Sequence, residues 1–387
     1  MRDGWPYEEL QKAGVAVLDC EHKTPRDAGT GHPYIAIPNI VDGRIYLSGV
    51  RRVTREDFIE WTRRTKPQSG DVVVTRRGRV GDTAPIPSGL ECAIGQNLVI
   101  LRSNGYSVAQ RFLRWATRGE AWMSEVHRLL NVGAVFSSLN VRDISRLRIF
   151  TPPLAEQQAI SGILDALDSK ITVNERVTAT ASELAVAHYL AAPERDLVKI
   201  TDVAQVTMGQ SPPGDTFNEQ GIGLPFYQGT RDFGFRFPGR RVWCTAVTRQ
   251  AKANDVLVSV RAPVGQINVA AELCGIGRGL ASVRSEEYPH VLLQALSADR
   301  SIWNPYAAEG TIFGSITKKQ FTQLEIGWPK PEFIDSLELR LKVLDQRIRQ
   351  AAAESRTLAA LRDTLLPQLM SGKLRVREAE KIVEDAV

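Results

Sequence analysis

The chain has 387 residues, of which 43% are hydrophobic, with a formal net charge of +5 and a pI near 9.0. These values are typical of a globular protein of about two or three domains, and they permit nucleic-acid binding without requiring it. No run approaches the ~18 apolar residues of a membrane span, and the start MRDGWPYEEL is unlike a signal peptide, so we expect a cytoplasmic location.

The first 151 residues predict a compact α+β domain. Short β-branched runs separated by Gly and Pro predict strands at Tyr34–Ile37, Asp71–Thr75 and Leu98–Leu101. One helix is predicted over Val108–Leu130. Two of the four scattered cysteines fall here, and because none has metal-ligand spacing we expect all four to be reduced core thiols: Cys20, Cys92, Cys244 and Cys274.

Residues 152–192 predict a long helix with apolar residues on the 4-3 spacing of a coiled-coil seam. The predicted pairing positions are Ile160, Leu164, Leu167 and Ile171. Leu154–Ala192 carries 2 Lys and Arg against 5 Asp and Glu, whereas Met1–Phe150 carries 22 against 16. A helix that wraps DNA should be basic along one face, so this helix is better interpreted as a spacer or a protein-binding surface.

The second half of the chain repeats the first. Three segments match in the same order: Asp71–Gly81 with Asp255–Gly265, Ala93–Leu98 with Gly275–Leu280, and Gly133–Leu139 with Gly310–Ile316. Such collinear matches indicate an internal duplication. They predict a second α+β domain at 193–330 that is similar to the first.

A second seam helix follows at 331–387, which also includes the tail. Its predicted pairing positions are Leu337, Leu341, Leu344 and Ile348, each 177 residues after its counterpart in the first helix. We therefore expect the two helices to pack antiparallel about a pseudo-twofold axis and to separate the two domains. Polar residues interrupt the seam at Asn174, Thr178 and Ser355 and could fix its register, and Pro367 should kink or end the second helix.

Several segments in this arrangement have a family signature. They are Pro152–Ile160 (PPLAEQQAI), Leu167–Ile171 (LDSKI), Leu344–Ile348 (LDQRI) and Leu365–Leu374 (LLPQLMSGKL). With these motifs the whole chain resembles the specificity subunits of Type I restriction-modification systems. It departs from the pattern at Pro331–Ile334 (PEFI), where the second helix lacks the Glu-Gln-Gln run.

The resemblance implies a non-catalytic subunit with two target recognition domains, each reading one half of a bipartite, asymmetric site in double-stranded DNA. It implies docking of two methylation subunits, which use S-adenosylmethionine, and of restriction/translocase subunits, which use ATP and Mg²⁺. No cofactor is then expected in this chain, which has no GxxxxGK[ST] loop and no GxGxxG after a strand.

Two other functions remain open at this point. One is a stand-alone DNA methyltransferase or nuclease with duplicated DNA-binding domains, although Asn304-Pro-Tyr306 only approaches the adenine-binding motif of amino-methyltransferases. The other is a protein-binding coiled-coil adaptor.

Polar residues on loops beside the repeated strands are the candidate DNA contacts, since Arg can pair with guanine and Gln or Asn with adenine. In the first domain these are Arg76, Arg77, Arg79, Gln96 and Asn97; in the second they are Arg261 and Arg278, with Arg236, Arg240 and Arg241 from an aromatic-rich loop.

Overall fold

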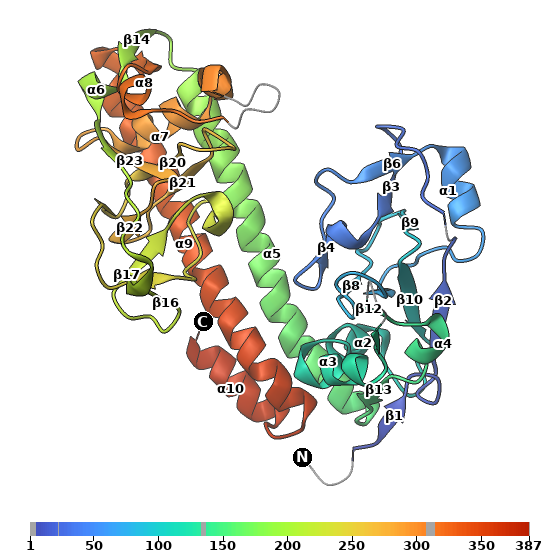
Figure 1. The fold of residues 1–387 in the computed structure, drawn as a ribbon. Helices are drawn as coiled ribbons and strands as arrows, with labels where there is room; N and C mark the ends of the chain where they lie inside the picture. Colours follow the sequence, from blue (N-terminus) through green and yellow to red (C-terminus); the bar gives the residue numbers. More distant parts are fainter. Residues whose placement is uncertain (1–4, 22, 133–136, 307–313, 387) are drawn as a thin grey trace. The chain divides into compact units, whose positions relative to one another are not determined.

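The structure is a computed structural model that describes residues 5–21, 23–132, 137–306 and 314–386. The chain divides into two compact units, residues 1–173 with 354–387, and residues 174–353. The division passes through the middle of both long helices, so each unit contains one α+β domain and half of each helix (Figure 1).

The first domain is built on an antiparallel sheet of four strands with a smaller sheet beside it. The larger sheet has the order β2 (Val15–Asp19), β10 (Leu98–Ser103), β7 (Val72–Thr75) and β8 (Thr83–Pro85), and the smaller one β6 (Arg51–Val53), β3 (His32–Ile35) and β9 (Ala93–Ile94). Strands β3 and β9 pair in parallel, whereas the other pairs are antiparallel.

Strand β7 shows why this sequence forms a central strand. All four of its side chains are buried, and successive side chains point to opposite faces of the sheet. Val72 and Val74 pack in the core that contains the domain's helices, and Val73 packs in a second core on the other face. The Val-rich run is therefore fully buried between two layers, as short continuous apolar strands are.

The helix predicted over Val108–Leu130 is wrong in its continuity. The structure has two helices there, α2 (Gln110–Ala116) and α3 (Gly119–Arg128). Gly119 has a φ of 81°, a left-handed conformation that glycine adopts without steric cost and that interrupts the helical path. The break lets α2 and α3 present Trp115 and Trp122 to the same core.

The second domain repeats this topology. Its four-stranded sheet has the order β15 (Gln205–Met208), β23 (Leu280–Arg284), β20 (Val256–Ser259) and β21 (Ile267–Val269), and the adjoining sheet has the order β16 (Phe217–Asn218), β18 (Trp243–Cys244), β17 (Leu224–Tyr227), β22 (Cys274–Ile276) and β19 (Gln250–Ala251). The one parallel pair among these strands, β17 with β22, matches β3 with β9. The matching strand order agrees with the predicted duplication.

Short elements complete both domains. They are β1 (Tyr7–Glu9), β4 (Ile40–Val41), β5 (Arg44–Ile45), α1 (Arg55–Trp61), β11 (Asn131–Val132), β12 (Ser137–Ser138), α4 (Val141–Ile144) and β13 (Arg148–Phe150) in the first, and β14 (Arg195–Lys199), α6 (Ile200–Val203), α7 (Pro289–Ser297), α8 (Lys318–Thr322) and β24 (Glu325–Pro329) in the second. Pairs β1–β13 and β14–β24 close each domain just before its long helix. All four cysteines are free and buried, as predicted.

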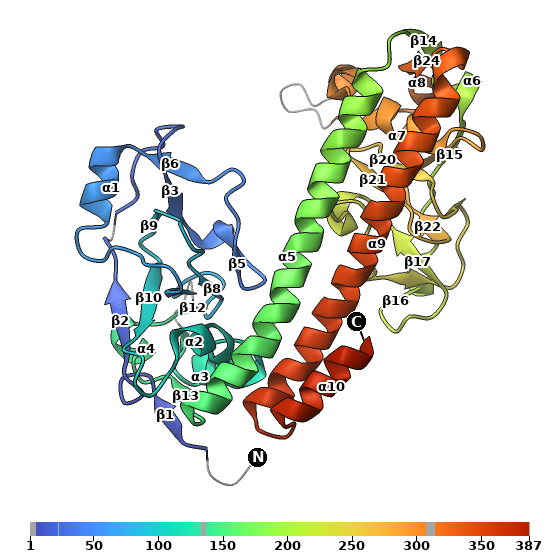
Figure 2. The same cartoon turned by 180° about the vertical axis from the view of Figure 1, so that it is seen from behind.

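The long helices are α5 (Leu154–Leu190) and α9 (Pro331–Met370), which lie side by side (Figures 1 and 2). The first half of α5 shares a unit with the second half of α9, and the reverse holds in the other unit, so they pack antiparallel as predicted. The predicted pairing residues are buried except Leu344, which is partly buried: Ile160, Leu164, Leu167, Ile171, Leu337, Leu341, Leu344 and Ile348.

Helix α9 continues through Pro367, so this proline does not end it. The helix ends at a turn in which Gly372 has a φ of 67° and the Lys373 N–H donates to the Gln368 carbonyl at 3.0 Å. Helix α10 (Val376–Ala386) then folds back, with Ala379 buried in the core of the first unit. Among the described helices, none is long and apolar enough to cross a membrane.

Candidate nucleic-acid interface

Three loops meet in the first domain at the end of β7. The Arg76 N–H donates to the Asn97 carbonyl at 2.9 Å, which joins the β7–β8 loop to the β9–β10 turn. The Leu139 N–H donates to the Arg76 carbonyl at 2.9 Å, and Arg77 forms a β-bridge with Ser138, which joins both to the segment around β12. We call this arrangement the three-loop junction.

The second domain has the same three-loop junction. The Val260 N–H donates to the Gly279 carbonyl at 2.9 Å, and the Ile316 N–H donates to the Val260 carbonyl at 3.0 Å. Arg261 forms a β-bridge with Ser315, as Arg77 does with Ser138. The repeated sequence therefore produces a repeated loop framework. The segments 133–136 and 307–313, which belong to the third predicted match, lie outside the described residues.

An ion pair between a buried aspartate and an arginine joins the two central strands of each sheet, at the end of the strands away from the junction. Arg102 donates to both oxygens of Asp71, at 2.8 and 2.6 Å, and Arg284 donates to both oxygens of Asp255, at 2.7 and 2.8 Å. Such bidentate pairs fix both distance and orientation. The two aspartates lie in aligned segments of the repeat, whereas the two arginines were not predicted, although each stands four residues after the matched Leu98 or Leu280.

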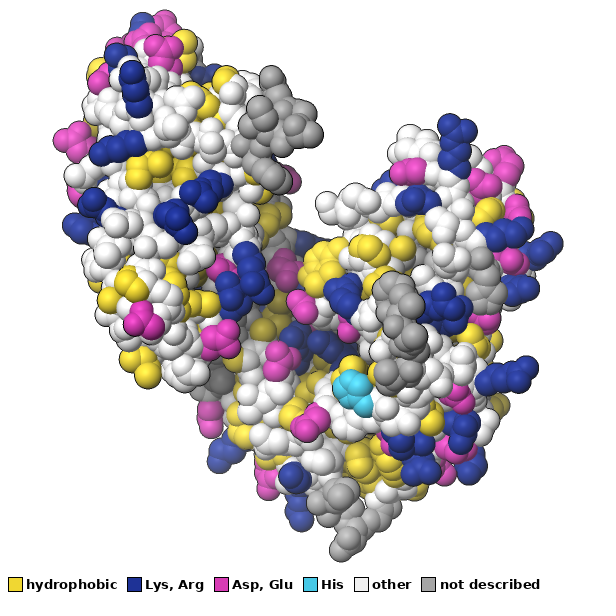
Figure 3. Space-filling view, viewed as in Figure 1, with side chains coloured by type: hydrophobic (Ala, Val, Ile, Leu, Met, Phe, Trp, Pro, Cys, Tyr) yellow, Lys and Arg dark blue, Asp and Glu magenta, His cyan; other side chains and the backbone are white. Residues whose placement is uncertain are grey.

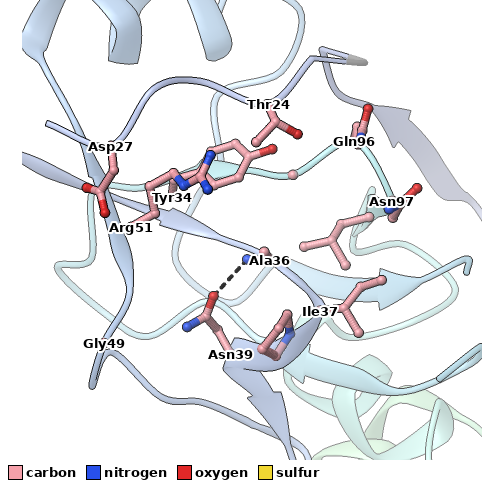
Figure 4. A pocket seen from close by; sticks show the side chains of 13 residues that line it. Thr24, Asp27, Tyr34, Ala36, Ile37, Asn39, Gly49, Arg51, Gln96 and Asn97 are labelled. Carbon is pink, nitrogen blue, oxygen red and sulfur yellow. Dashed lines mark hydrogen bonds between the residues drawn. The ribbon is translucent and has the colours of Figure 1, made fainter. Parts of the chain in front are cut away.

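At the first junction, Arg77 is exposed, and Gln96 and Asn97 are partly exposed at the edge of a pocket of about 400 Å³. Figure 4 shows Gln96 and Asn97 on one side of this pocket, Arg51 and Asp27 on the opposite side, and the Tyr34 ring between them. The Tyr34 ring is buried, so the groups that this site offers for recognising base edges are the amides and the guanidinium.

Arg51 and Tyr34 were not among the predicted contacts, and Asn39 also lines this pocket. The Asn39 amide is used internally, since its Oδ1 accepts from the Ala36 N–H at 2.9 Å (Figure 4) and its Nδ2 donates to the Tyr46 carbonyl at 3.2 Å. Arg51 Nη1 donates to the Pro25 carbonyl at 2.5 Å. These contacts shape the pocket wall. They could not be predicted from the repeat, because the residues lie outside the aligned segments.

The second junction presents different chemistry. Arg261 and Arg278 are both exposed and line a pocket of about 720 Å³ together with Ser315 and Thr317. Arg278 Nε donates to the Ser211 hydroxyl at 3.4 Å. In the aligned sequences Arg278 stands where the first domain has Gln96, so one framework carries a guanidinium in one unit and an amide in the other.

Two other predicted arginines hold the first junction together. Arg76 Nη2 donates to the Gln96 carbonyl at 3.1 Å, and Arg79 Nη2 donates to the Ile37 carbonyl at 2.7 Å. Arg79 also pairs with Asp82 at 3.3 Å. The Arg76 and Arg79 side chains therefore position the loops around the pocket.

The three predicted arginines of the aromatic-rich loop are all ion-paired within the second unit. Arg236 is largely buried and pairs with Asp345 of α9. Arg240 pairs with Glu272 at 2.5 Å and Arg241 with Asp232 at 2.6 Å, and these two side chains are 61% and 41% exposed. Arg236 is therefore placed to hold the loop on the helix, whereas the exposed pair remains accessible from solvent.

The surface charge does not mark the interface by itself. On the face drawn in Figure 3, Lys and Arg side chains are interspersed with Asp and Glu and gather in no single basic patch. Within the described part of the chain, no group of three or more His, Cys, Asp or Glu side chains could hold a metal ion.

Comparisons with known proteins agree with this architecture. Residues 20–181 match the model of the Type I restriction modification DNA specificity domain. The chain is 26% identical to a Methanocaldococcus jannaschii protein described as the specificity subunit of a type I restriction enzyme, MjaX, over 97% of this chain and 95% of that one.

A solved structure shows the same fold. The S subunit of a Type-I restriction-modification system from M. genitalium matches with a TM-score of 0.60 at 15% identity, covering 96% of this chain and 97% of that chain. The HsdS subunit from Thermoanaerobacter tengcongensis is 25% identical, covering 97% and 98% of the two chains, with a TM-score of 0.37. Residues 20–181 are thus similar to the Type I restriction modification DNA specificity domain, and the whole chain is similar to specificity subunits of Type I restriction-modification systems, a family of non-catalytic parts of a methyltransferase and restriction complex.

Proposed function

We propose that this specificity subunit reads a bipartite, asymmetric site in double-stranded DNA, with one half-site for each domain. The observation that carries the proposal is the repeated three-loop junction with unlike side chains. Gln96 and Asn97 stand in the first unit where Arg278 and Gly279 stand in the second, on loops held by the same hydrogen bonds. Gln and Asn suit adenine and Arg suits guanine, so the two domains should read different bases.

Within this proposal the exposed and partly exposed residues of the two junctions are the base readers: Arg77, Gln96, Asn97, Arg261 and Arg278. Arg240 and Arg241 are exposed and could hold phosphates after exchanging their carboxylate partners. Arg76, Arg79 and Arg236 are engaged in contacts that shape the loops, and we assign them a supporting position beside the DNA.

The subunit would also dock two methylation subunits and the restriction/translocase subunits. The family is part of such a complex, which supports this docking. S-adenosylmethionine, ATP and Mg²⁺ would be bound by those partners. The exposed apolar side chains Leu339 and Val343, one turn apart on α9 and 64% and 58% exposed, offer a surface for a partner.

The test is to co-express the chain with its methylation subunit and to map methylated adenines across the host genome by single-molecule sequencing. The expected result is a split motif of two different short halves with a fixed gap. Methylation at one continuous site would overturn the bipartite proposal. A stable complex without methylation would favour a protein-binding adaptor instead.

A further inference from the structure

Two buried aspartates occupy equivalent positions on the long helices. Asp168 of α5 and Asp345 of α9 are separated by 177 residues, the same offset that relates all the predicted seam residues. Their relative exposures are only 6% and 3%. A buried carboxylate is costly unless cations and hydrogen-bond donors surround it, so the partners of each aspartate indicate what it does.

Asp168 joins three separate segments of the first unit. Arg44 of β5 donates to its Oδ1 at 2.9 Å, and Arg114 of α2 donates to its Oδ2 at 2.6 Å. Arg362 of α9 also donates to Oδ1, at 2.9 Å. One carboxylate on α5 therefore binds two segments of the recognition domain and also the neighbouring long helix.

Asp345 also gathers cationic groups in the second unit, but its helical partner is on α9 itself. Arg236, from the loop of the recognition domain, donates to its Oδ1, and Arg349, one turn further along α9, donates to its Oδ2 at 2.5 Å. The Nε2 atom of His290, on α7 of the same domain, lies 3.6 Å from Oδ2. Again one carboxylate on a long helix meets two cationic groups of the domain beside it.

The electrostatics agree with this geometry. Burial acts to raise the pKa of Asp168, but Arg44 and Arg114 outweigh it and lower the pKa to about 2. Burial has the same effect on Asp345, yet His290 and Arg236 hold its pKa well below the usual range. Burial lowers the pKa of His290, but its contacts with Asp345 and Glu338 raise it to about 9, so the imidazole is charged at neutral pH.

We propose that Asp168 and Asp345 are positioning residues that fix the orientation of each recognition domain on its long helix, and that they thereby set the gap between half-sites that the subunit accepts. This inference rests on the proposed bipartite function. A change of one base pair in the gap displaces a half-site by about 3.4 Å and rotates it by about 35° around the DNA axis. A domain held by two directional ion pairs resists such a shift, because the pairs break if it tilts.

The test uses the full chain in complex with its methylation subunits and a set of duplexes whose two half-sites are separated by gaps that differ in single base-pair steps. Asp168→Asn and Asp345→Asn keep the shape of the side chain but remove its charge. We expect each variant to lower the preference for the best gap over its neighbours by about tenfold or more, with the half-site sequences unchanged.

Two further sets of variants complete the design. Arg44→Lys and Arg236→Lys keep the charge but lose the planar fork, so they should broaden the gap preference while folding normally. Glu183→Gln removes a charge from an exposed position of α5 and should leave the gap preference unchanged. Melting temperatures of all variants show whether a change in binding follows a loss of folded protein.

The outcomes separate the two proposals. If the variants bind more weakly at every gap by the same factor, the aspartates only stabilise the fold, and the positioning role is overturned. If the unsubstituted complex binds isolated half-sites as well as paired ones, the bipartite function itself fails and this inference fails with it. A broadened gap preference with intact half-sites supports both.

Discussion

Gln157 is fully buried at the start of α5, where its amide makes three hydrogen bonds. Its Oε1 accepts from the Ala109 N–H at 2.7 Å, and its Nε2 donates to the Ser107 and Pro152 carbonyls at 2.8 and 2.7 Å. The residue therefore attaches the start of the helix to the loop before α2. This gives a physical reason for the first glutamine of the Glu-Gln-Gln run, Glu156-Gln157-Gln158.

We predict that Gln157→Ala lowers the free energy of unfolding by about 1–3 kcal/mol, because it leaves buried backbone groups without partners. Urea unfolding followed by circular dichroism measures the change. The neighbouring Gln158 is exposed, so Gln158→Ala is the matched control and should change stability by no more than about 0.5 kcal/mol. Equal effects of the two substitutions would contradict the proposed attachment.

At the scale of residues, the positions of the motifs could be predicted from the sequence, but the side-chain contacts of their residues could not. The matched Leu-Asp pairs at Leu167 and Leu344 were visible, but nothing in the sequence showed that Asp168 and Asp345 gather arginines from distant loops. Arg236 was predicted as a DNA contact because it sits in a basic, aromatic-rich loop, and its pairing with Asp345 depends on packing that no local pattern encodes.

At the scale of elements, the seam was predictable because a 4-3 apolar spacing fixes which face of a long helix is buried. The break at Gly119 was not predictable, because a single glycine inside an apolar helical pattern is compatible with either a continuous or an interrupted helix.

The two polar seam residues Asn174 and Thr178 are alike in the sequence pattern but differ in the structure. Both are buried, but the Thr178 hydroxyl donates to the Asn174 carbonyl at 2.8 Å within α5 itself.

We therefore predict that, of these two residues, Asn174 fixes the register and Thr178 does not. Thr178→Val removes a hydroxyl whose partner is in the same helix and should change stability by less than about 1 kcal/mol, without changing the preferred gap. Asn174→Leu should raise the melting temperature and broaden the gap preference, since a buried polar residue specifies register at a cost in stability. Thermal melting measures the changes in stability, and binding to the duplex gap series measures the gap preference. An unchanged gap preference in Asn174→Leu would remove the register role of this residue.

At the scale of the whole molecule, the duplication was the most predictable feature. Aligned segments such as Asp71–Gly81 and Asp255–Gly265 occupy the same strands and loops in both domains. The framework follows from these shared residues because buried strands and turn glycines constrain backbone structure. The surface of the framework does not follow from the shared residues. Exposed loop residues are free of those packing constraints, so they can differ between the two halves.

This separation of framework and surface leads to a prediction about the two half-sites. Gln96→Ala should relax the base preference at a position of one half-site by about 1–3 kcal/mol, and Arg278→Ala should do so in the other half-site. Each substitution should leave the opposite half unchanged, because the two side chains belong to separate units with separate cores. Methylome maps of complexes with each variant, normalised to the unsubstituted complex, measure the base preference in both half-sites in one experiment.

If one substitution relaxed the base preference in both half-sites, the domains would be reading a single shared site. If neither altered any base preference while binding persisted, recognition would depend on other parts of the pockets, with Arg51 and Thr317 the next residues to replace.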